Sequence, residues 1–145
     1  MRGFLLGHHF FGGRIKTPVV CYKNDGRMSS MIQYVVVRSD LMEELKWPTG
    51  AVIAQACHAS TAALHLFRED EDTQAYTKNL DTMHKVVLAC PSEAELRSIQ
   101  SKLTAASISH KLWIERPEEI PTALATKPYP KADVSPFFKH LKLYK

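Results

Sequence analysis

Cysteine and long apolar runs are scarce in this sequence. The cysteines are widely spaced and form no C-x-x-C pair: Cys21, Cys57 and Cys90. That spacing argues against a disulfide framework and a zinc cluster, and it indicates reduced thiols in an intracellular protein. No apolar run approaches the length that a membrane span needs. The 145 residues therefore predict one domain with a core of its own and no membrane segment.

Acidic residues are nearly absent from residues 1–30, which carry five basic side chains and one acidic side chain. This segment also lacks a sustained hydrophobic periodicity. Its composition predicts a disordered basic leader, with a mitochondrial transit peptide as the alternative. We accordingly divide the chain into a leader over residues 1–30 and a folded domain over residues 31–145. The first interpretation predicts a cytoplasmic protein and the second a mitochondrial one.

The folded part carries 14 basic and 14 acidic side chains, so it is not basic overall. Its positive charge is concentrated at the end, because residues 127–145 hold five lysines and one aspartate. If these lysines share one face they form a local phosphate-binding patch, and a solvated helix face explains them equally well. The candidates for RNA binding are Arg38, Lys127, Lys131, Lys139, Lys142 and Lys145.

Short β-branched runs alternate with helical patterns along the folded part. Buried strands are predicted over residues 32–37, 85–90 and 110–115, and a shorter one over 122–126. Helices are predicted over residues 49–67, 74–80, 92–106 and 131–141. This alternation predicts an α/β fold with a mostly parallel sheet. Ligands commonly bind at the carboxyl ends of such strands, where Arg38 and Asp40 follow the first one.

The helix over residues 49–67 contains the stretch A-Q-A-C-H-A-S at 54–60. At 100° per residue, Gln55 and His58 fall on the outer face, where side chains at i and i+3 meet. Cys57 falls beside the predicted core face, next to Ile53, and is predicted to be a small buried filler. Cys57 and His58 are adjacent and do not face each other, which argues against a nucleophile pair. Periodicity permits a site at Gln55 and His58, and it fits an ordinary surface histidine as well.

Five motifs, in order, resemble the type II peptidyl-tRNA hydrolase family. They are R-S-D-L at 38–41, G-A-V-I-A-Q-A-C-H-A at 50–59, K-V-V-L at 85–88, P-S-E-A-E-L at 91–96 and H-L-K-L-Y at 140–144. The W-P-x-G start of the helix and K-P-Y-P at 127–130 are most similar to its divergent peptidyl-tRNA hydrolase domain-containing branch. The resemblance implies a three-layer α/β/α sandwich on a four-stranded mixed sheet. It also implies hydrolysis of the ester between peptide and tRNA, with peptidyl-tRNA or tRNA as partner and no required cofactor or metal.

The resemblance also assigns residues to the site. Asp40 matches the aspartate after the first strand, and Gln55 and His58 match the helix glutamine and histidine. Glu115 stands for an aspartate and Thr122 for a threonine that follow the third strand. Ester hydrolysis requires an activated water and donors for the oxyanion. The resemblance thus offers His58 with Asp40 or Glu115 for activating water, and Gln55 or Thr122 for donating to the oxyanion.

Two departures from the family pattern indicate reduced or altered catalysis. Ala51 replaces a lysine, and E-R-P-E-E-I at 115–120 replaces a loop that contains a glycine and a threonine. Arg38, Arg116 or Lys127 could supply the missing positive charge. The sequence leaves two hypotheses: a peptidyl-tRNA hydrolase, and a non-catalytic descendant that binds RNA or protein. It also leaves the oligomeric state open between a monomer and a homodimer.

Overall fold

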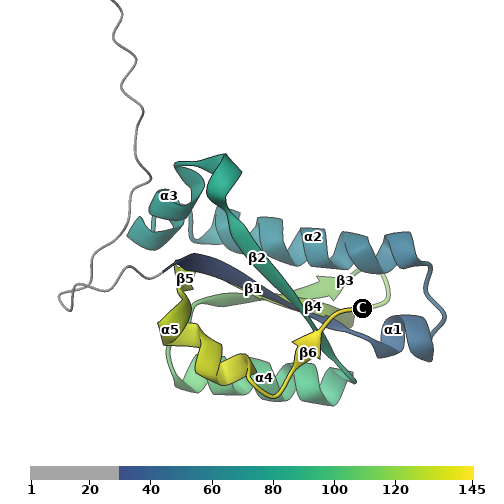
Figure 1. Cartoon of the computed structure of the whole chain (residues 1–145). Helices are drawn as coiled ribbons and strands as arrows, with labels where there is room; N and C mark the ends of the chain where they lie inside the picture. Colours follow the sequence, from purple (N-terminus) through teal and green to yellow (C-terminus); the bar gives the residue numbers. More distant parts are fainter. Residues whose placement is uncertain (1–29) are drawn as a thin grey trace, which may run out of the picture.

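Six strands form one mixed sheet in the computed structural model of the chain, which describes residues 30–145 (Figure 1). Residues 1–29 of the predicted leader lie outside the described part. The strands are β1 (Met31–Arg38), β2 (His84–Cys90), β3 (His110–Glu115), β4 (Ile120–Thr126), β5 (Tyr129–Pro130) and β6 (Lys142–Leu143). The helices are α1 (Asp40–Glu43), α2 (Thr49–Leu66), α3 (Glu71–Thr77), α4 (Glu93–Ala105) and α5 (Lys131–Val134), with 3₁₀ helices at Leu80–Thr82 and Ser135–Phe138.

The sheet is mostly antiparallel, so the prediction of a four-stranded, mostly parallel sheet is wrong. Its order is β3-β4-β1-β2-β6, and β5 pairs with β1. Among the described strands, β1 and β2 run parallel, whereas the other four pairs are antiparallel. β3 and β4 form a hairpin because residues 116–119 are too few for the crossover that parallel strands need. The α/β class is confirmed. β3 has the predicted bounds 110–115, and β4 begins at Ile120, two residues before the predicted strand over 122–126.

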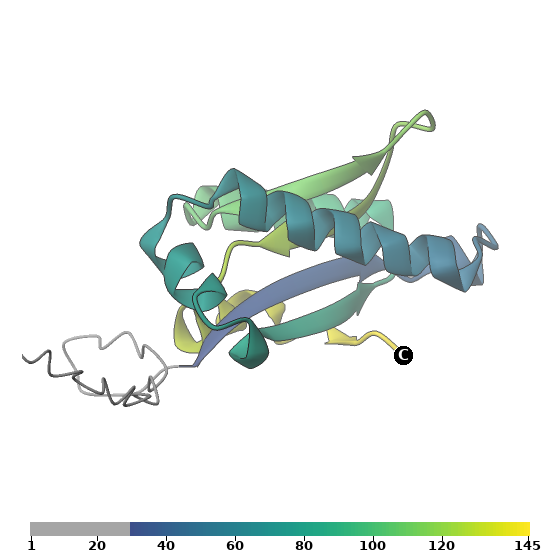
Figure 2. The ribbon, with the colours of Figure 1, turned by 90° about the horizontal axis from the view of Figure 1, so that it is seen from above.

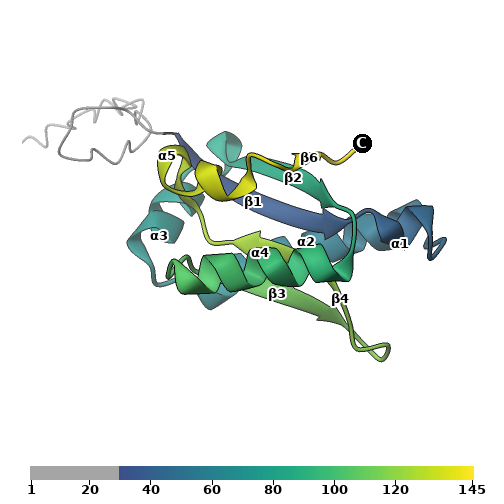
Figure 3. The ribbon, with the colours of Figure 1, turned by 90° about the horizontal axis from the view of Figure 1, so that it is seen from below.

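Helices cover both faces of the sheet. α2 packs on β1, β4 and β3, and α4 packs on the same strands from the opposite side (Figure 1, Figure 3). Alternation along β1 sends Val36 into the core beneath α4, and Val35 and Val37 into the core beneath α2. The α2 core is rich in alanine, which lets this helix lie close to the strands. No described helix is both long and apolar enough to span a membrane.

α2 turns a different face to the sheet than the helical wheel predicts. Gln55 is 3% exposed, whereas Ile53 is 59% exposed and Cys57 is exposed too. The predictions of an outward-facing Gln55 and a buried Cys57 are therefore wrong. The wheel assumes that apolar side chains point inward, but α2 lies over β3 and β4, where Thr122 gives the Gln55 amide a buried hydrogen-bond partner.

A buried glutamine of β1 fixes the position of α2. Ser60 Oγ of the helix donates to Gln33 Oε1 across 2.8 Å, and Gln33 Nε2 donates to the Thr126 carbonyl across 3.0 Å. Gln33 and Thr126 have no exposed surface. Because an unpaired amide is costly in a core, these bonds resist sliding of the helix along the sheet. They tie the second half of α2, through β1, to the end of β4.

Candidate active site

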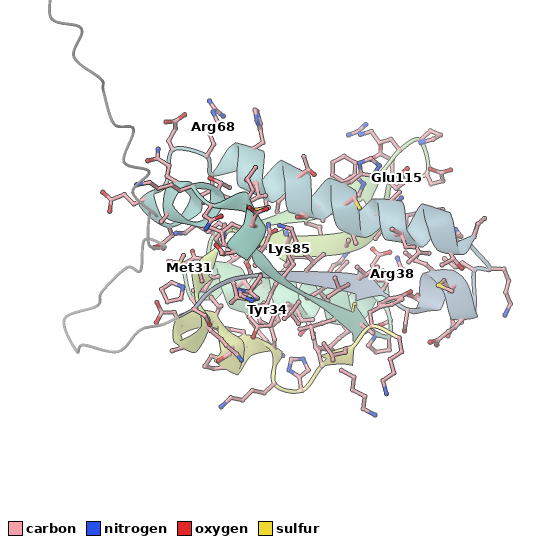
Figure 4. The ribbon with its side chains drawn as sticks, turned by 45° about the horizontal axis from the view of Figure 1, so that its top comes forward. Met31, Tyr34, Arg38, Arg68, Lys85 and Glu115 are labelled. Atoms are coloured by element: carbon pink, nitrogen blue, oxygen red, sulfur yellow. The ribbon has the colours of Figure 1, made fainter. Side chains whose placement is uncertain are left out.

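The polar residues assigned to a site gather at the end of the sheet where β1, a central strand, finishes. Antiparallel pairing brings the beginning of β4 and the end of β3 to this same end of the sheet, since Val37 pairs with Ala123 and Glu115 with Ile120. Arg38 and Glu115 lie in the same half of the molecule, near the beginning of α2 (Figure 4). The end of β1, the first half of α2 and the β3–β4 hairpin therefore contribute side chains to one region.

Gln55 and Thr122 meet in this region although they are 67 residues apart in the sequence. Thr122 Oγ1 donates to Gln55 Oε1 across 2.8 Å, and both residues are buried. The donors that remain are on Gln55 Nε2, which lies 3.4 Å from the Ala51 carbonyl, a long hydrogen bond. A donor fixed in a place shielded from water stabilises charge more strongly than one in bulk solvent.

His58 lies one turn after Gln55, on the exposed side of α2. Its imidazole stacks on the indole of Trp113 in β3, with the ring centroids 4.7 Å apart and the planes 17° apart. Trp113 Nε1 in turn donates to Glu115 Oε2 across 2.9 Å. Within residues 30–145, no hydrogen bond or ion pair joins His58 to Asp40 or Glu115, so their pairing with His58 stays a prediction.

Trp113 is absent from the predicted site, although the sequence contained a signal for it. Along a strand, residues at i and i+2 point to the same face. Trp113 and Glu115 therefore share one face of β3, and that face lies beneath α2. No pattern in the sequence indicates that His58 would cover this indole, because the contact joins two elements far apart in the chain.

Asp40, the first residue of α1, is held by Arg38. The Arg38 guanidinium donates to both carboxylate oxygens of Asp40, at 3.0 and 2.6 Å, and also to Glu93 and the Pro121 carbonyl. The hydrogen bond with Asp40 is the main reason why the pKa of Arg38 lies above its ordinary value despite burial. Arg38 is 6% and Asp40 7% exposed. Both side chains are thus occupied within the protein, and their roles in RNA binding and catalysis stay predictions.

The candidate lysines divide into one buried residue and four exposed ones. The Lys127 ammonium is held between Asp70 and Asp72, at 2.6 and 2.7 Å. Burial lowers the pKa of Lys127, but the bonds to the two carboxylates outweigh it and raise the pKa above its ordinary value. The exposed ones are Lys131, Lys139, Lys142 and Lys145. Of these, Lys142 and Lys145 line a groove of about 440 Å³ beside Ser39, next to the site.

Ala51 lies in the first turn of α2, where the resemblance implies a lysine. The preceding Pro48 makes no side-chain capping bond, and the first turn contains no acidic residue. The helix N-terminus therefore presents a partial positive charge close to position 51, where the family pattern has a lysine. The loop at 115–120, which departs from the family pattern, forms the tip of the β3–β4 hairpin, and this hairpin projects from the sheet (Figure 2). In this loop Arg116 forms an ion pair of 2.8 Å with the exposed Glu119.

An amide and a hydroxyl meet at this end of the sheet, and an imidazole lies about one turn further along α2. They can hold a carbonyl group, donate a hydrogen bond to it and accept a proton from water. Across the described residues, no three or more His, Cys, Asp or Glu side chains lie close enough together to hold a metal ion.

Known proteins with similar sequences place this chain in a family. Residues 31–144 match the sequence pattern of the family described as peptidyl-tRNA hydrolase PTH2. The mouse and human proteins named "Putative peptidyl-tRNA hydrolase PTRHD1" are 47% and 46% identical over 116 residues, which cover 79% of this chain and 83% of each relative. "Probable peptidyl-tRNA hydrolase 2" of Dictyostelium discoideum is 30% identical over 125 residues, which cover 83% of this chain and 58% of that protein. These matches confirm the resemblance seen in the sequence, and the chain belongs to the peptidyl-tRNA hydrolase PTH2 family.

Proposed function

We propose that this chain hydrolyses the ester bond that joins a peptide to the ribose of tRNA. The contact between Gln55 and Thr122 carries the proposal, because two residues matched to the family's site meet across a long stretch of sequence. His58, a third matched residue, lies on the next turn of the same helix. Membership of the family supports peptidyl-tRNA as the substrate.

Each of the three groups has a role in the proposed reaction. His58 takes a proton from a water molecule while the water oxygen attacks the ester carbonyl carbon. The carbonyl oxygen becomes negatively charged and accepts a hydrogen bond from Gln55 Nε2, whose orientation Thr122 fixes. The bond between this carbon and the ribose oxygen then breaks, and the proton on His58 passes to that oxygen. The products are a peptide with a free carboxyl group and a tRNA with a free ribose hydroxyl.

The N-terminus of α2 supplies part of the positive field that the missing lysine would provide. Its dipole acts on groups beside the first turn, where Ala51 lies. A half-charge at a helix end is weaker than an ammonium, so we propose a slower enzyme than a relative that keeps the lysine. The carboxylates of Asp40 and Glu115 border the same region without taking a step in this reaction.

Single-turnover hydrolysis of peptidyl-tRNA by purified protein tests the proposal. We expect release of peptide above the uncatalysed rate and a loss of about 100-fold in His58→Ala, the contribution typical of a general base. His65→Ala is the matched control, because His65 is an exposed histidine of the same helix, two turns further on. Wild-type protein that is no faster than buffer would end the enzyme hypothesis.

A non-catalytic tRNA-binding role is the second candidate, favoured by the site's shortage of free cations. Ala51 provides no charge, and Arg38 and Lys127 are held by carboxylates of the protein itself. Phosphate contacts would then come from exposed lysines such as Lys142 and Lys145 beside the groove at Ser39. Binding of this kind releases counterions and therefore weakens as salt rises.

Titrating fluorescent tRNA with the protein at several salt concentrations tests this second role. We expect Lys142→Gln to reduce the slope of log affinity against log salt by a little under one unit, as for one lost phosphate contact. Lys127→Gln should leave the slope unchanged, because Asp70 and Asp72 already neutralise that ammonium. Absent or salt-independent binding would argue against a role with RNA and favour binding of a protein.

A further inference from the structure

His58, Trp113 and Glu115 form a chain of contacts that the proposed reaction does not explain. The carboxylate accepts the indole N–H at 2.9 Å, and the indole face carries the imidazole at a centroid distance of 4.7 Å. Trp113 and Glu115 are both partly buried, whereas His58 is exposed. In this chain of contacts the indole therefore lies between the carboxylate and the imidazole.

The indole is the fixed member of this chain. Trp113 packs against the core beneath α2, which contains Val52 and Ala59 of the helix. The hydrogen bond to Glu115 then fixes the direction in which the indole N–H points, and with it the orientation of the ring. An exposed histidine on a helix would otherwise sample several rotamers, and stacking of two flat rings selects one of them.

We infer that Glu115 is a positioning residue, which orients the His58 imidazole through Trp113 without touching the substrate or the reacting water. This inference rests on the proposed role of His58. The carboxylate is needed as a hydrogen-bond acceptor for the indole N–H, and its negative charge is not required. An amide oxygen accepts the same bond, so a glutamine at this position should preserve the arrangement.

The pair Glu115→Gln and Glu115→Ala separates this role from a direct one. We expect Glu115→Gln to keep kcat within about twofold, and Glu115→Ala to lower kcat about tenfold with little change in KM, because misplacing a reacting group slows the chemical step. Glu118→Ala is the matched control, since Glu118 is an exposed carboxylate of the same hairpin. It should behave as wild type.

The orientation of His58 can be measured without any substrate. The ring current of Trp113 shifts the imidazole C–H proton signals of His58 upfield in an NMR spectrum, and His58→Ala identifies these signals among the seven histidines. We expect the shift to persist in Glu115→Gln and Glu118→Ala, and to shrink in Glu115→Ala. Trp113→Leu should abolish the shift, but it also removes core packing, so the two Glu115 variants are decisive.

Two results would overturn the inference. Equal loss of kcat in Glu115→Gln and Glu115→Ala would mean that the reaction uses the carboxylate itself. An unchanged His58 ring-current shift in Glu115→Ala would mean that Trp113 needs no support from Glu115. If the wild-type protein hydrolyses nothing, the proposed function fails, while the NMR comparison still decides whether Glu115 orients His58.

Discussion

The two flanks of α2 differ sharply, although the helix contains no aspartate, glutamate, lysine or arginine between Thr49 and Leu66. On the flank toward β3 and β4, Gln55 bonds Thr122 and His58 stacks on Trp113. On the flank toward β2, Ile53 and Cys57 border a groove of about 250 Å³ whose other lining residues include Val87 and Tyr144. The first flank forms a buried hydrogen bond and a ring stack, and the second is an open apolar surface.

The difference arises from the sheet and not from the helix. β4 and β3 place a hydroxyl and an indole beneath one flank, and each finds a partner on α2. β2 places Val87 beneath the other flank, where it stays 37% exposed because α2 packs on β1, β4 and β3. The alanines of α2 offer no polar partners of their own, so the strands beneath the helix decide which of its side chains form a hydrogen bond or a ring contact.

Among variants that test the difference between the two flanks, we expect the largest loss of activity from Thr122→Val, which keeps the shape of the side chain and removes the hydroxyl. Without its partner the Gln55 amide loses its fixed orientation, and we expect kcat for peptidyl-tRNA hydrolysis to fall about 100-fold. Leaving Gln55 Oε1 buried without a donor should also cost roughly 1–3 kcal/mol of folding free energy. Single-turnover rates and thermal unfolding curves measure the two effects.

Thr122→Ser is the control, because serine keeps the hydroxyl that bonds Gln55. It should retain most of the activity and stability. If valine and serine gave the same activity, the hydroxyl would have no role, and the polar flank would be no more functional than the apolar one.

The smallest effect is expected from blocking Cys57 on the apolar flank. Iodoacetamide should modify the exposed Cys57 well before Cys90, since burial raises the pKa of the Cys90 thiol to about 12 and leaves almost no thiolate near neutral pH. We expect activity to stay within about twofold, because the groove lies on the flank away from the candidate site. Peptide mass spectrometry locates the label, and a Cys21→Ser background removes the third thiol.

Activity that fell in proportion to Cys57 labelling would contradict the distinction between a polar flank that takes part in the reaction and an apolar flank that does not. It would mean that the apolar groove takes part in binding the substrate or in placing α2. The same labelling in Ile53→Ser protein, where the groove wall is altered at a residue already 59% exposed, distinguishes these two explanations. A role in binding would change KM, whereas a displaced helix would change kcat.

Local patterns predicted the elements of this fold better than their pairing. β-branched runs identify β1 and β2, and the serine at 92 caps α4 by accepting a hydrogen bond from the Glu95 N–H. Strand direction was mispredicted because it depends on the length of each connection, and residues 116–119 allow only a hairpin. Alternation of strands and helices alone does not carry that information.

The residues of the candidate site could be predicted only as far as the sequence resembles a known family. Gln55 and Thr122 could be named together only from that resemblance, since nothing in either local sequence indicates their contact. The helical wheel placed Gln55 outside because it treats amides as solvent-facing, and a buried hydroxyl overrides that preference. The burial of Lys127 escaped prediction for a similar reason, because its partners Asp70 and Asp72 lie in a distant acidic segment.

The bonds of Arg38 have a consequence for anyone who interprets variants of Asp40. This guanidinium ties together the end of β1, the first turns of α1 and α4, and the beginning of β4. Replacing Asp40 by alanine would leave Glu93 as the remaining carboxylate partner of the buried Arg38 guanidinium, and losing one partner of a buried ion pair is destabilising. We therefore expect such a variant to have a lower free energy of unfolding than the wild type. Loss of activity in an Asp40 variant therefore implicates the carboxylate in the reaction only where that variant keeps native stability.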